Sequence, residues 1–126
     1  MSTPFDPNIL TRRSDADLSS SAWFLVKAVG DDDLDVAGAG ELCIGALTND
    51  VADGSSTATY VPVQIGGIIK ASVGAAVTAG TLVMSDGSGE AITATDGNYA
   101  IGIALGTYAN GEIGAFLWAP SYFENT

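Results

Sequence analysis

The chain has 126 residues, the length of a single domain, and 47% of them are hydrophobic. Fifteen acidic residues against four basic ones give a net charge of −11, which disfavours binding to nucleic acid and to anionic membranes because both carry negative charge. With no histidine and one cysteine, the chain lacks the residues for Ser-His-Asp or Cys-His catalysis and for the usual zinc sites.

Residues 1–21 differ in character from the rest of the chain. Pro4 and Pro7 disfavour helix, and the segment holds both arginines of the chain before it ends in a polar stretch. We therefore predict an extended N-terminal arm that becomes ordered against a partner; a frayed tail is the alternative. The candidate contact residues of this arm are Phe5, Ile9, Leu10, Arg12 and Arg13.

The first predicted strand spans residues 22–29, where aromatic and β-branched residues precede a glycine. Four aspartates follow between Asp31 and Asp35. An EF-hand loop counted from Asp31 needs glycine and glutamate at its sixth and twelfth positions, but these are Val36 and Leu42. The EF-hand match fails, so we predict a solvated acidic turn; a looser calcium site remains an alternative.

Further short strands are predicted at residues 41–47, 57–65 and 68–73, with a short strand or a loop at 36–40 and a polar loop at 48–56. Pro62 lacks the amide hydrogen that a strand ladder needs, which places strand 57–65 at a sheet edge or a bulge. Cys43 has apolar neighbours, which predicts a buried small side chain and not a nucleophile.

Residues 80–118 read as four strands separated by glycine-marked turns, at Asp86–Gly89, Asp96–Asn98 and Asn110-Gly111. In the third of these strands, residues 99–106, large and small side chains alternate. The large set is predicted to share one face: Tyr99, Ile101, Ile103 and Leu105. The small set, Ala100, Gly102 and Ala104, is predicted to form a bare face that another layer of backbone or another subunit approaches closely.

Trp118, Tyr122 and Phe123 are predicted to form an aromatic cluster near the C-terminus, which covers the end of the fold or faces a partner. Altogether the pattern predicts an all-β fold, a small β-barrel or sandwich of about nine short strands, formed by residues 22–126 as one domain.

The sequence contains no recognisable catalytic motif, and it predicts no cofactor site and no metal site beyond the acidic run. Gly87-Ser88-Gly89 lacks the lysine and the helix of a phosphate-binding loop. The acidic residues lie mostly in predicted turns, where they favour solubility. Since only 15% of the residues are charged, we expect a subunit of a larger assembly. Because the catalytic motifs are missing and the carboxylates lie in solvated turns, we do not expect an enzyme.

Five glycine-containing segments follow one another along the C-terminal half: Gly66-Gly-Ile-Ile-Lys-Ala, Ala76-Val-Thr-Ala-Gly-Thr-Leu-Val, Asp86-Gly-Ser-Gly-Glu-Ala, Ala100-Ile-Gly-Ile-Ala-Leu-Gly, and Gly111-Glu-Ile-Gly-Ala-Phe-Leu. Over about residues 60–118 the chain thereby resembles the capsid decoration, or cement, proteins of tailed bacteriophages. The resemblance implies a homotrimer on the outer surface of the phage head, made in the host cytoplasm. It also implies that an N-terminal arm reaches over subunits of the major capsid protein.

Two alternatives of a different kind remain at this point. In the first alternative, the chain is a virion or cell-surface β-domain that binds a glycan or a receptor, with Trp118, Tyr122 and Phe123 stacking on sugars. In the second alternative, it is a tail or fibre component of a virion.

Overall fold

The computed structural model describes residues 8–14, 22–29, 33–47 and 59–123, and in these ranges the chain forms ten strands and no helix. The strands are β1 (Asn8–Ser14), β2 (Leu25–Val29), β3 (Asp33–Val36), β4 (Gly45–Leu47), β5 (Thr59–Gly66), β6 (Ile68–Ser72), β7 (Leu82–Ser85), β8 (Ala91–Thr93), β9 (Asn98–Ala104) and β10 (Ile113–Phe123). They form two antiparallel five-stranded sheets. The prediction of an all-β fold is confirmed, and the arrangement is sandwich-like and not a closed barrel.

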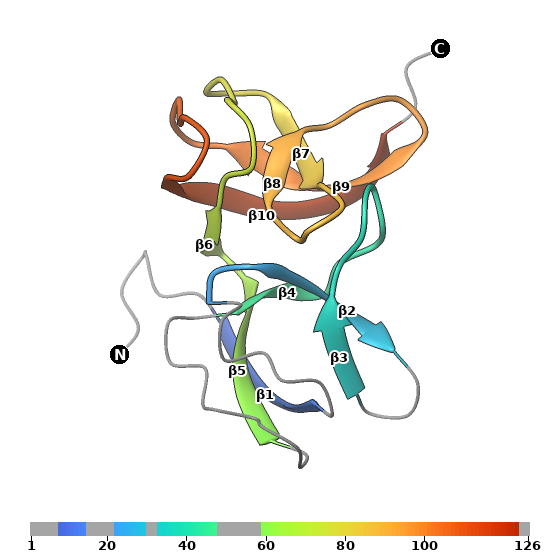
Figure 1. Cartoon of the computed structure of the whole chain (residues 1–126). Helices are drawn as coiled ribbons and strands as arrows, with labels where there is room; N and C mark the ends of the chain where they lie inside the picture. Colours follow the sequence, from blue (N-terminus) through green and yellow to red (C-terminus); the bar gives the residue numbers. More distant parts are fainter. Residues whose placement is uncertain (1–7, 15–21, 30–32, 48–58, 124–126) are drawn as a thin grey trace.

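The first sheet has the order β1-β5-β4-β2-β3 and the second the order β6-β10-β9-β7-β8. Figure 1 shows the first sheet in the lower half of the molecule and the second in the upper half. The chain passes from one to the other at the turn between β5 and β6, where Gly67 has a φ of 69° that favours glycine. All later strands belong to the second sheet.

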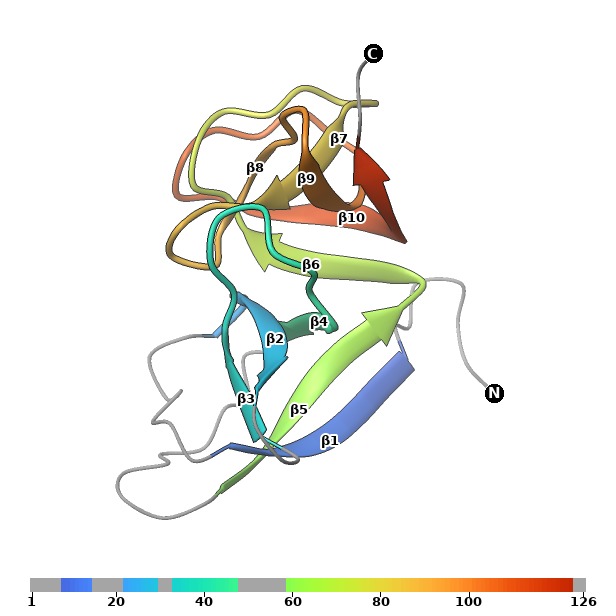
Figure 2. The same cartoon turned by 90° about the vertical axis from the view of Figure 1, so that its right-hand side faces the viewer.

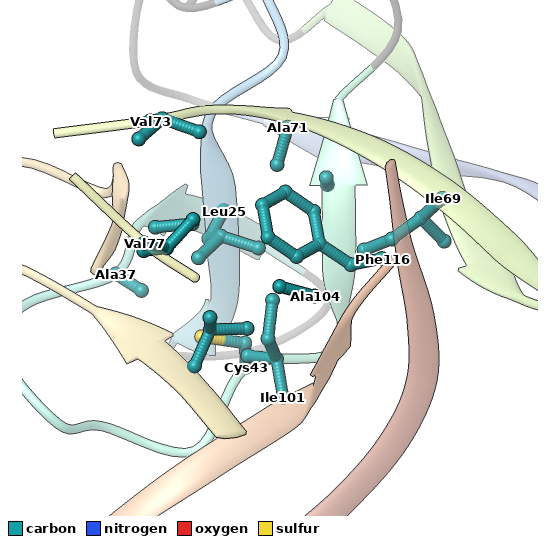
Figure 3. Packing of buried hydrophobic residues seen from close by; sticks show 13 residues of the cluster. Leu25, Ala37, Cys43, Ile69, Ala71, Val73, Val77, Ile101, Ala104 and Phe116 are labelled. Atoms are coloured by element: carbon teal, nitrogen blue, oxygen red, sulfur yellow. The ribbon is translucent and has the colours of Figure 1, made fainter. Parts of the chain in front are cut away.

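The main core lies between the two sheets and is centred on the ring of Phe116 (Figure 3). Leu25 and Ala46 reach it from the first sheet, while Ile69 and Ala104 reach it from the second. Each of these side chains is at most 1% exposed. A smaller cluster of Val26, Leu34, Leu47 and Val63 is buried within the first sheet. Alternating side chains of β2 thus serve two separate clusters, because successive residues of a strand point to opposite faces.

Gln64 of β5 connects the two sheets through its buried side-chain amide. Its Nε2 donates to the carbonyl oxygens of Leu47 (3.2 Å) and Lys70 (3.0 Å), and its Oε1 accepts the backbone N–H of Lys70 (3.0 Å). Lys70 lies in β6, the edge strand of the second sheet. The amide therefore pairs with the backbone of β6 as a neighbouring strand would.

The predicted glycine turns are confirmed, since Gly89, Gly97 and Gly111 all have positive φ angles of 84°, 85° and 92°. The predicted alternation along residues 99–106 is wrong beyond Gly102, because Ile101 and Ala104 both point into the core. Gly102 lies so close to the neighbouring strand that an added Cβ would overlap the carbonyl oxygen of Leu117. The close backbone approach that its small size predicted comes from β10, within the same sheet.

Two strands differ in length from their predictions. β2 begins at Leu25 and not at residue 22, because Trp23 has a φ of 69° and turns the backbone before the strand. β10 continues past Trp118 to Phe123. It passes Pro120 through a bulge between Trp118 and Ser121, where a residue without an amide hydrogen is tolerated.

Pro62 lies in β5, which has β1 on one side and β4 on the other. It pairs with Thr11 of β1, whereas the pairing of β4 already ends with Leu47 opposite Val63. Within the described ranges Pro62 thus has a strand partner on one side only. The polar loop predicted at 48–56 lies outside the described residues.

We predict that replacing Gln64 by methionine lowers the free energy of unfolding by about 2–4 kcal/mol, because both backbone groups of Lys70 lose their hydrogen-bond partner and the Leu47 carbonyl keeps only the N–H of Trp23. Urea denaturation of both proteins measures the difference. As a control, Thr93→Ala at an exposed position of β8 should change stability by less than about 0.5 kcal/mol. Equal midpoints for wild type and Gln64→Met would contradict a structural role for this amide.

Candidate interaction surfaces

Several carboxylates in the described ranges accept hydrogen bonds from backbone N–H groups of their own turns. Asp86 Oδ1 accepts the N–H groups of Ser88 (2.8 Å) and Glu90 (3.0 Å), which closes the turn between β7 and β8. Glu112 Oε1 accepts the N–H of Ala109 at 2.6 Å in the turn before β10. Over the described part of the chain, no group of three or more histidine, cysteine, aspartate or glutamate side chains converges to hold a metal ion. These acidic groups therefore act as turn-forming residues.

The predicted acidic turn ends earlier than expected. Asp31 and Asp32 lie outside the described residues, and β3 begins at Asp33, so the prediction is wrong from that residue onward. Asp35 lies opposite Lys27 of β2, and its Oδ1 accepts the N–H of Val36 at 2.7 Å. Pairing with β2 has drawn the second half of the acidic run into the sheet.

The middle of the predicted N-terminal arm is a strand of the first sheet. β1 pairs antiparallel with β5, and it contains the candidate residues Ile9, Leu10, Arg12 and Arg13. The free edge of β5 gives this extended segment a ladder of backbone partners, so residues 8–14 lie within the body and not detached from it. Asn8 pairs with Gly66, at the crossing between the two sheets, while Phe5 lies outside the described residues.

The predicted aromatic cluster is divided by the bulge in β10. The side chain of Trp118 is partly buried against the main core, and its backbone N–H donates to Gly67 O at 2.9 Å. Tyr122 is 54% exposed and contacts the ring of Tyr99 edge-on, with centroids 5.1 Å apart. Phe123 ends β10 opposite Asn98. Tyr99 was missed as a partner of Tyr122 because their pairing depends on the strand register.

A second surface, also missed from the sequence, is the side of the second sheet that faces away from the core. Ile68, Leu117, Ile103 and Leu82 lie directly opposite one another on β6, β10, β9 and β7, so they form one row across four strands. Their neighbours in sequence, such as Phe116 and Val83, point into the core, which places this row on the outside.

Further apolar side chains extend that row. Leu105 and Ile113 are 47% and 44% exposed, and Leu117 within the row is 42% exposed. We call Ile68, Leu82, Ile103, Leu105, Ile113 and Leu117 the outer apolar face. Lys70 stands at its border on β6, opposite Ala115. The strands that carry the face are labelled in the upper halves of Figures 1 and 2.

The loop between β3 and β4 joins the first sheet to the second. Gly40 donates its N–H to Ser85 O and accepts the N–H of Tyr99 on its own carbonyl, at 2.9 and 3.0 Å. Glu41 steadies this loop, because its Oε1 accepts both Lys27 Nζ (2.7 Å) and the N–H of Gly38 (2.6 Å). The hydrogen bond from Lys27 lowers the pKa of Glu41, with a further contribution from Gly38, and the same bond raises the pKa of Lys27.

Cys43 is 5% exposed and packs in the main core, so the prediction of a buried small side chain is confirmed. Burial raises the pKa of its thiol to about 12, and the nearby carboxylate of Glu41 acts in the same direction. The thiolate that alkylating reagents attack is therefore scarce at neutral pH.

We predict that Cys43 resists iodoacetamide at pH 8 in the folded protein and reacts readily in 6 M guanidinium chloride, because unfolding exposes the thiol and restores its ordinary acidity. Mass spectrometry of the intact chain counts the added groups. Rapid labelling of the native protein would contradict the burial of this side chain.

We predict that Glu41→Gln lowers stability slightly at neutral pH and not at low pH. The folded pKa of Glu41 is depressed, so its contribution is present above the ordinary value of 4.5 and is lost as the pH falls through the folded pKa. The raised pKa of Lys27 keeps the other partner charged up to and beyond 10.5. Urea denaturation between pH 3 and 8 measures the difference, which should shrink with added salt because the pair is exposed to solvent.

The Lys27→Met variant and the double variant complete a thermodynamic cycle with Glu41→Gln. If the ion pair is the cause, adding Lys27→Met to Glu41→Gln has less effect than Lys27→Met alone. A stability difference that persists unchanged at pH 3 would show that Glu41 acts through something other than its charge.

Comparison with known proteins agrees with this architecture. The structure of the N base of head fiber gp8.5 in bacteriophage phi29 is similar, with a TM-score of 0.72 and 18% sequence identity, over 95% of this chain and 100% of that one. At this identity the likeness concerns the fold. No curated protein has a sequence significantly similar to this chain. In the described residues, no helix has the length and apolar character needed to cross a bilayer.

The family comparison is more direct. The model of the phage cement protein family matches residues 10–116, from the first strand of one sheet to the last strand of the other. The match includes the segment around residues 60–118 on which the sequence resemblance depends. This chain belongs to the phage cement protein family.

Proposed function

We propose that this protein binds the outer surface of the phage head as a homotrimer and holds neighbouring subunits of the major capsid protein together. As a cement protein it is a structural part of the virion that stabilises the capsid from its surface. The trimer, the identity of the capsid partner and the mode of attachment are the proposed parts. The observation that carries the proposal is the family match over residues 10–116.

The construction of the body supports a structural role. Two sheets share a closely packed core, and the Gln64 amide and the loop at Gly40 join them across it. In the described part of the chain, every buried side-chain nitrogen or oxygen atom has a hydrogen-bond partner. Fully paired buried polar groups make a core rigid and specify one packing, which suits a subunit of an assembly.

Attachment through the N-terminus remains our proposal for residues 1–7. β1 begins at Asn8 beside the crossing between the sheets, so residues 1–7 lead into a point that is fixed to the body. Phe5 is the proposed anchor on the capsid, and Ile9, Leu10, Arg12 and Arg13 are proposed to contact it beside the strand edge of β1.

Three linked copies bind more tightly than one, because the second and third attachments occur at high effective concentration. Each attachment can then be weak while the whole trimer resists the pressure of packaged DNA. The net charge of −11 keeps coated particles apart in solution.

A second candidate function rests on the exposed pair of Tyr99 and Tyr122, whose rings lie 5.1 Å apart at the end of β10. Exposed aromatic faces stack on sugar rings, so this end of the sheet is a candidate site for a glycan or receptor. The similar structure belongs to a phage head fiber, which is compatible with display of such a site on the head. A glycan array with wild type and Tyr122→Ala decides it.

We predict that adding the purified protein to heads that lack it raises the temperature at which they release DNA, in proportion to the logarithm of its concentration once sites are being filled. Dye fluorescence during heating measures the release.

Deletion of residues 1–7 should leave the body folded, because β1 begins at Asn8, and should weaken head binding at least about tenfold.

Two results would contradict the proposal. Heads that release DNA at the same temperature with and without the protein would exclude the stabilising role. Unchanged binding after the deletion of residues 1–7 would exclude attachment through the N-terminus. Thermal unfolding of the shortened protein serves as the control for its fold.

A further inference from the structure

We infer that Asn110 is a site of spontaneous deamidation, which the fold keeps closed until the turn between β9 and β10 opens. Asn110 is the single asparagine of the chain that precedes a glycine, and both residues are exposed. The side chain of an asparagine reacts with the backbone nitrogen of the next residue, and a glycine there has no Cβ to hinder the approach. The pair Asn110-Gly111 therefore has the chemistry for this reaction without any catalyst.

The reaction consumes water and releases ammonia. Once the nitrogen of Gly111 has lost its proton, it attacks Cγ of Asn110. The side-chain nitrogen then takes up a proton and leaves as ammonia, so that a cyclic succinimide remains. Water opens this ring at either of its carbonyl carbons. Opening at Cγ gives aspartate, whereas opening at the original peptide carbon gives isoaspartate, in which the backbone runs through Cγ and is longer by that carbon. No oxidant or reductant takes part.

The structure withholds the attacking nitrogen. The N–H of Gly111 donates to the carbonyl oxygen of Val73 at 2.8 Å, and the carbonyl oxygen of Glu112 accepts the N–H of Val73 at 2.9 Å. Val73 is buried in the main core. A peptide proton held in such a pairing is removed by hydroxide only after the hydrogen bond opens. The nitrogen of Gly111 is therefore unreactive while the turn is closed.

Glu112 holds the turn closed. Its backbone N–H donates to Ala109 O at 3.1 Å, and Gly111 has a φ of 92° at the third position, as in a type II turn. Its carboxylate Oε1 accepts the N–H of Ala109 at 2.6 Å, which adds a charge-assisted hydrogen bond across the turn. These bonds oppose the opening that frees Gly111, so the stability of the turn sets the rate of deamidation.

Both products weaken the closed turn. Aspartate at position 110 adds a negative charge close to the carboxylate of Glu112, which already lies against the turn. Isoaspartate lengthens the backbone inside the segment that the hydrogen bond from Glu112 to Ala109 closes. Since ammonia is lost, neither change reverses. A structural protein of a virion is not renewed after assembly, so the altered chains accumulate as a particle ages.

The first test compares the folded and the denatured full chain at pH 8. Peptide mass spectrometry locates the mass gain at position 110. We expect the folded wild type to deamidate there at least about tenfold more slowly than the same chain in 6 M guanidinium chloride, because only the folded chain must first open the turn. Asn110→Gln, whose longer side chain closes a less favourable ring, should show no gain at this position over the same time.

Glu112→Ala tests whether opening of the turn controls the reaction. Without the carboxylate, the folded chain should deamidate about two- to tenfold faster, while the rate in guanidinium chloride stays unchanged. Hydrogen exchange of the Gly111 amide measures the opening independently and should increase by the same factor. Glu112→Gln keeps an acceptor oxygen for the N–H of Ala109, so its rate should lie nearer to that of the wild type.

Thermal unfolding checks that both variants are folded, and the wild-type comparison stands without them. No reaction at Asn110 in the denatured chain would overturn the site. Equal rates for folded and denatured wild type would overturn its closure by the fold. A Glu112→Ala chain that exchanges the Gly111 proton faster yet deamidates at the wild-type rate would overturn control by opening of the turn.

Discussion

The link between Gln64 and Lys70 holds β6, the strand on which the second sheet begins, beside the first sheet. The chain passes between the sheets through one short turn at Gly67, and β6 has β10 as its strand neighbour on one side only. The Gln64 amide satisfies both backbone groups of Lys70 on the other side. With β6 held in this way, Ile69 and Ala71 face Leu25 and Phe116 in the core.

The side chain of Tyr108 extends the hydrogen bonding of β10 on the side where β9 pairs with it. β9 ends at Ala104, and the N–H of Ala115 then donates to the hydroxyl of Tyr108 at 3.0 Å. Glycine at position 114 leaves room for that ring, since an added Cβ would come within 2.6 Å of it. The first half of β10 is therefore hydrogen-bonded on both of its sides.

The sequence predicted the parts of the fold that depend on local chemistry. Turns at Gly89, Gly97 and Gly111 follow from the backbone freedom of glycine, and the burial of Cys43 follows from its neighbours. Features that depend on which strands pair were not predictable in this way. The place of β1 beside β5 and the row across β6, β10, β9 and β7 both require the sheet order, which no local pattern contains. For the same reason no local pattern in the sequence marks Gln64 as the residue that pairs with β6.

The seclusion of Cys43 has a practical consequence for particles coated with this protein. The chain contains one cysteine, and the core encloses it. A thiol introduced at an exposed turn, as in Ser88→Cys, would then be the single handle on each copy for coupling to a maleimide. Decorated heads would carry dyes, peptides or antigens at one defined, evenly repeated spacing.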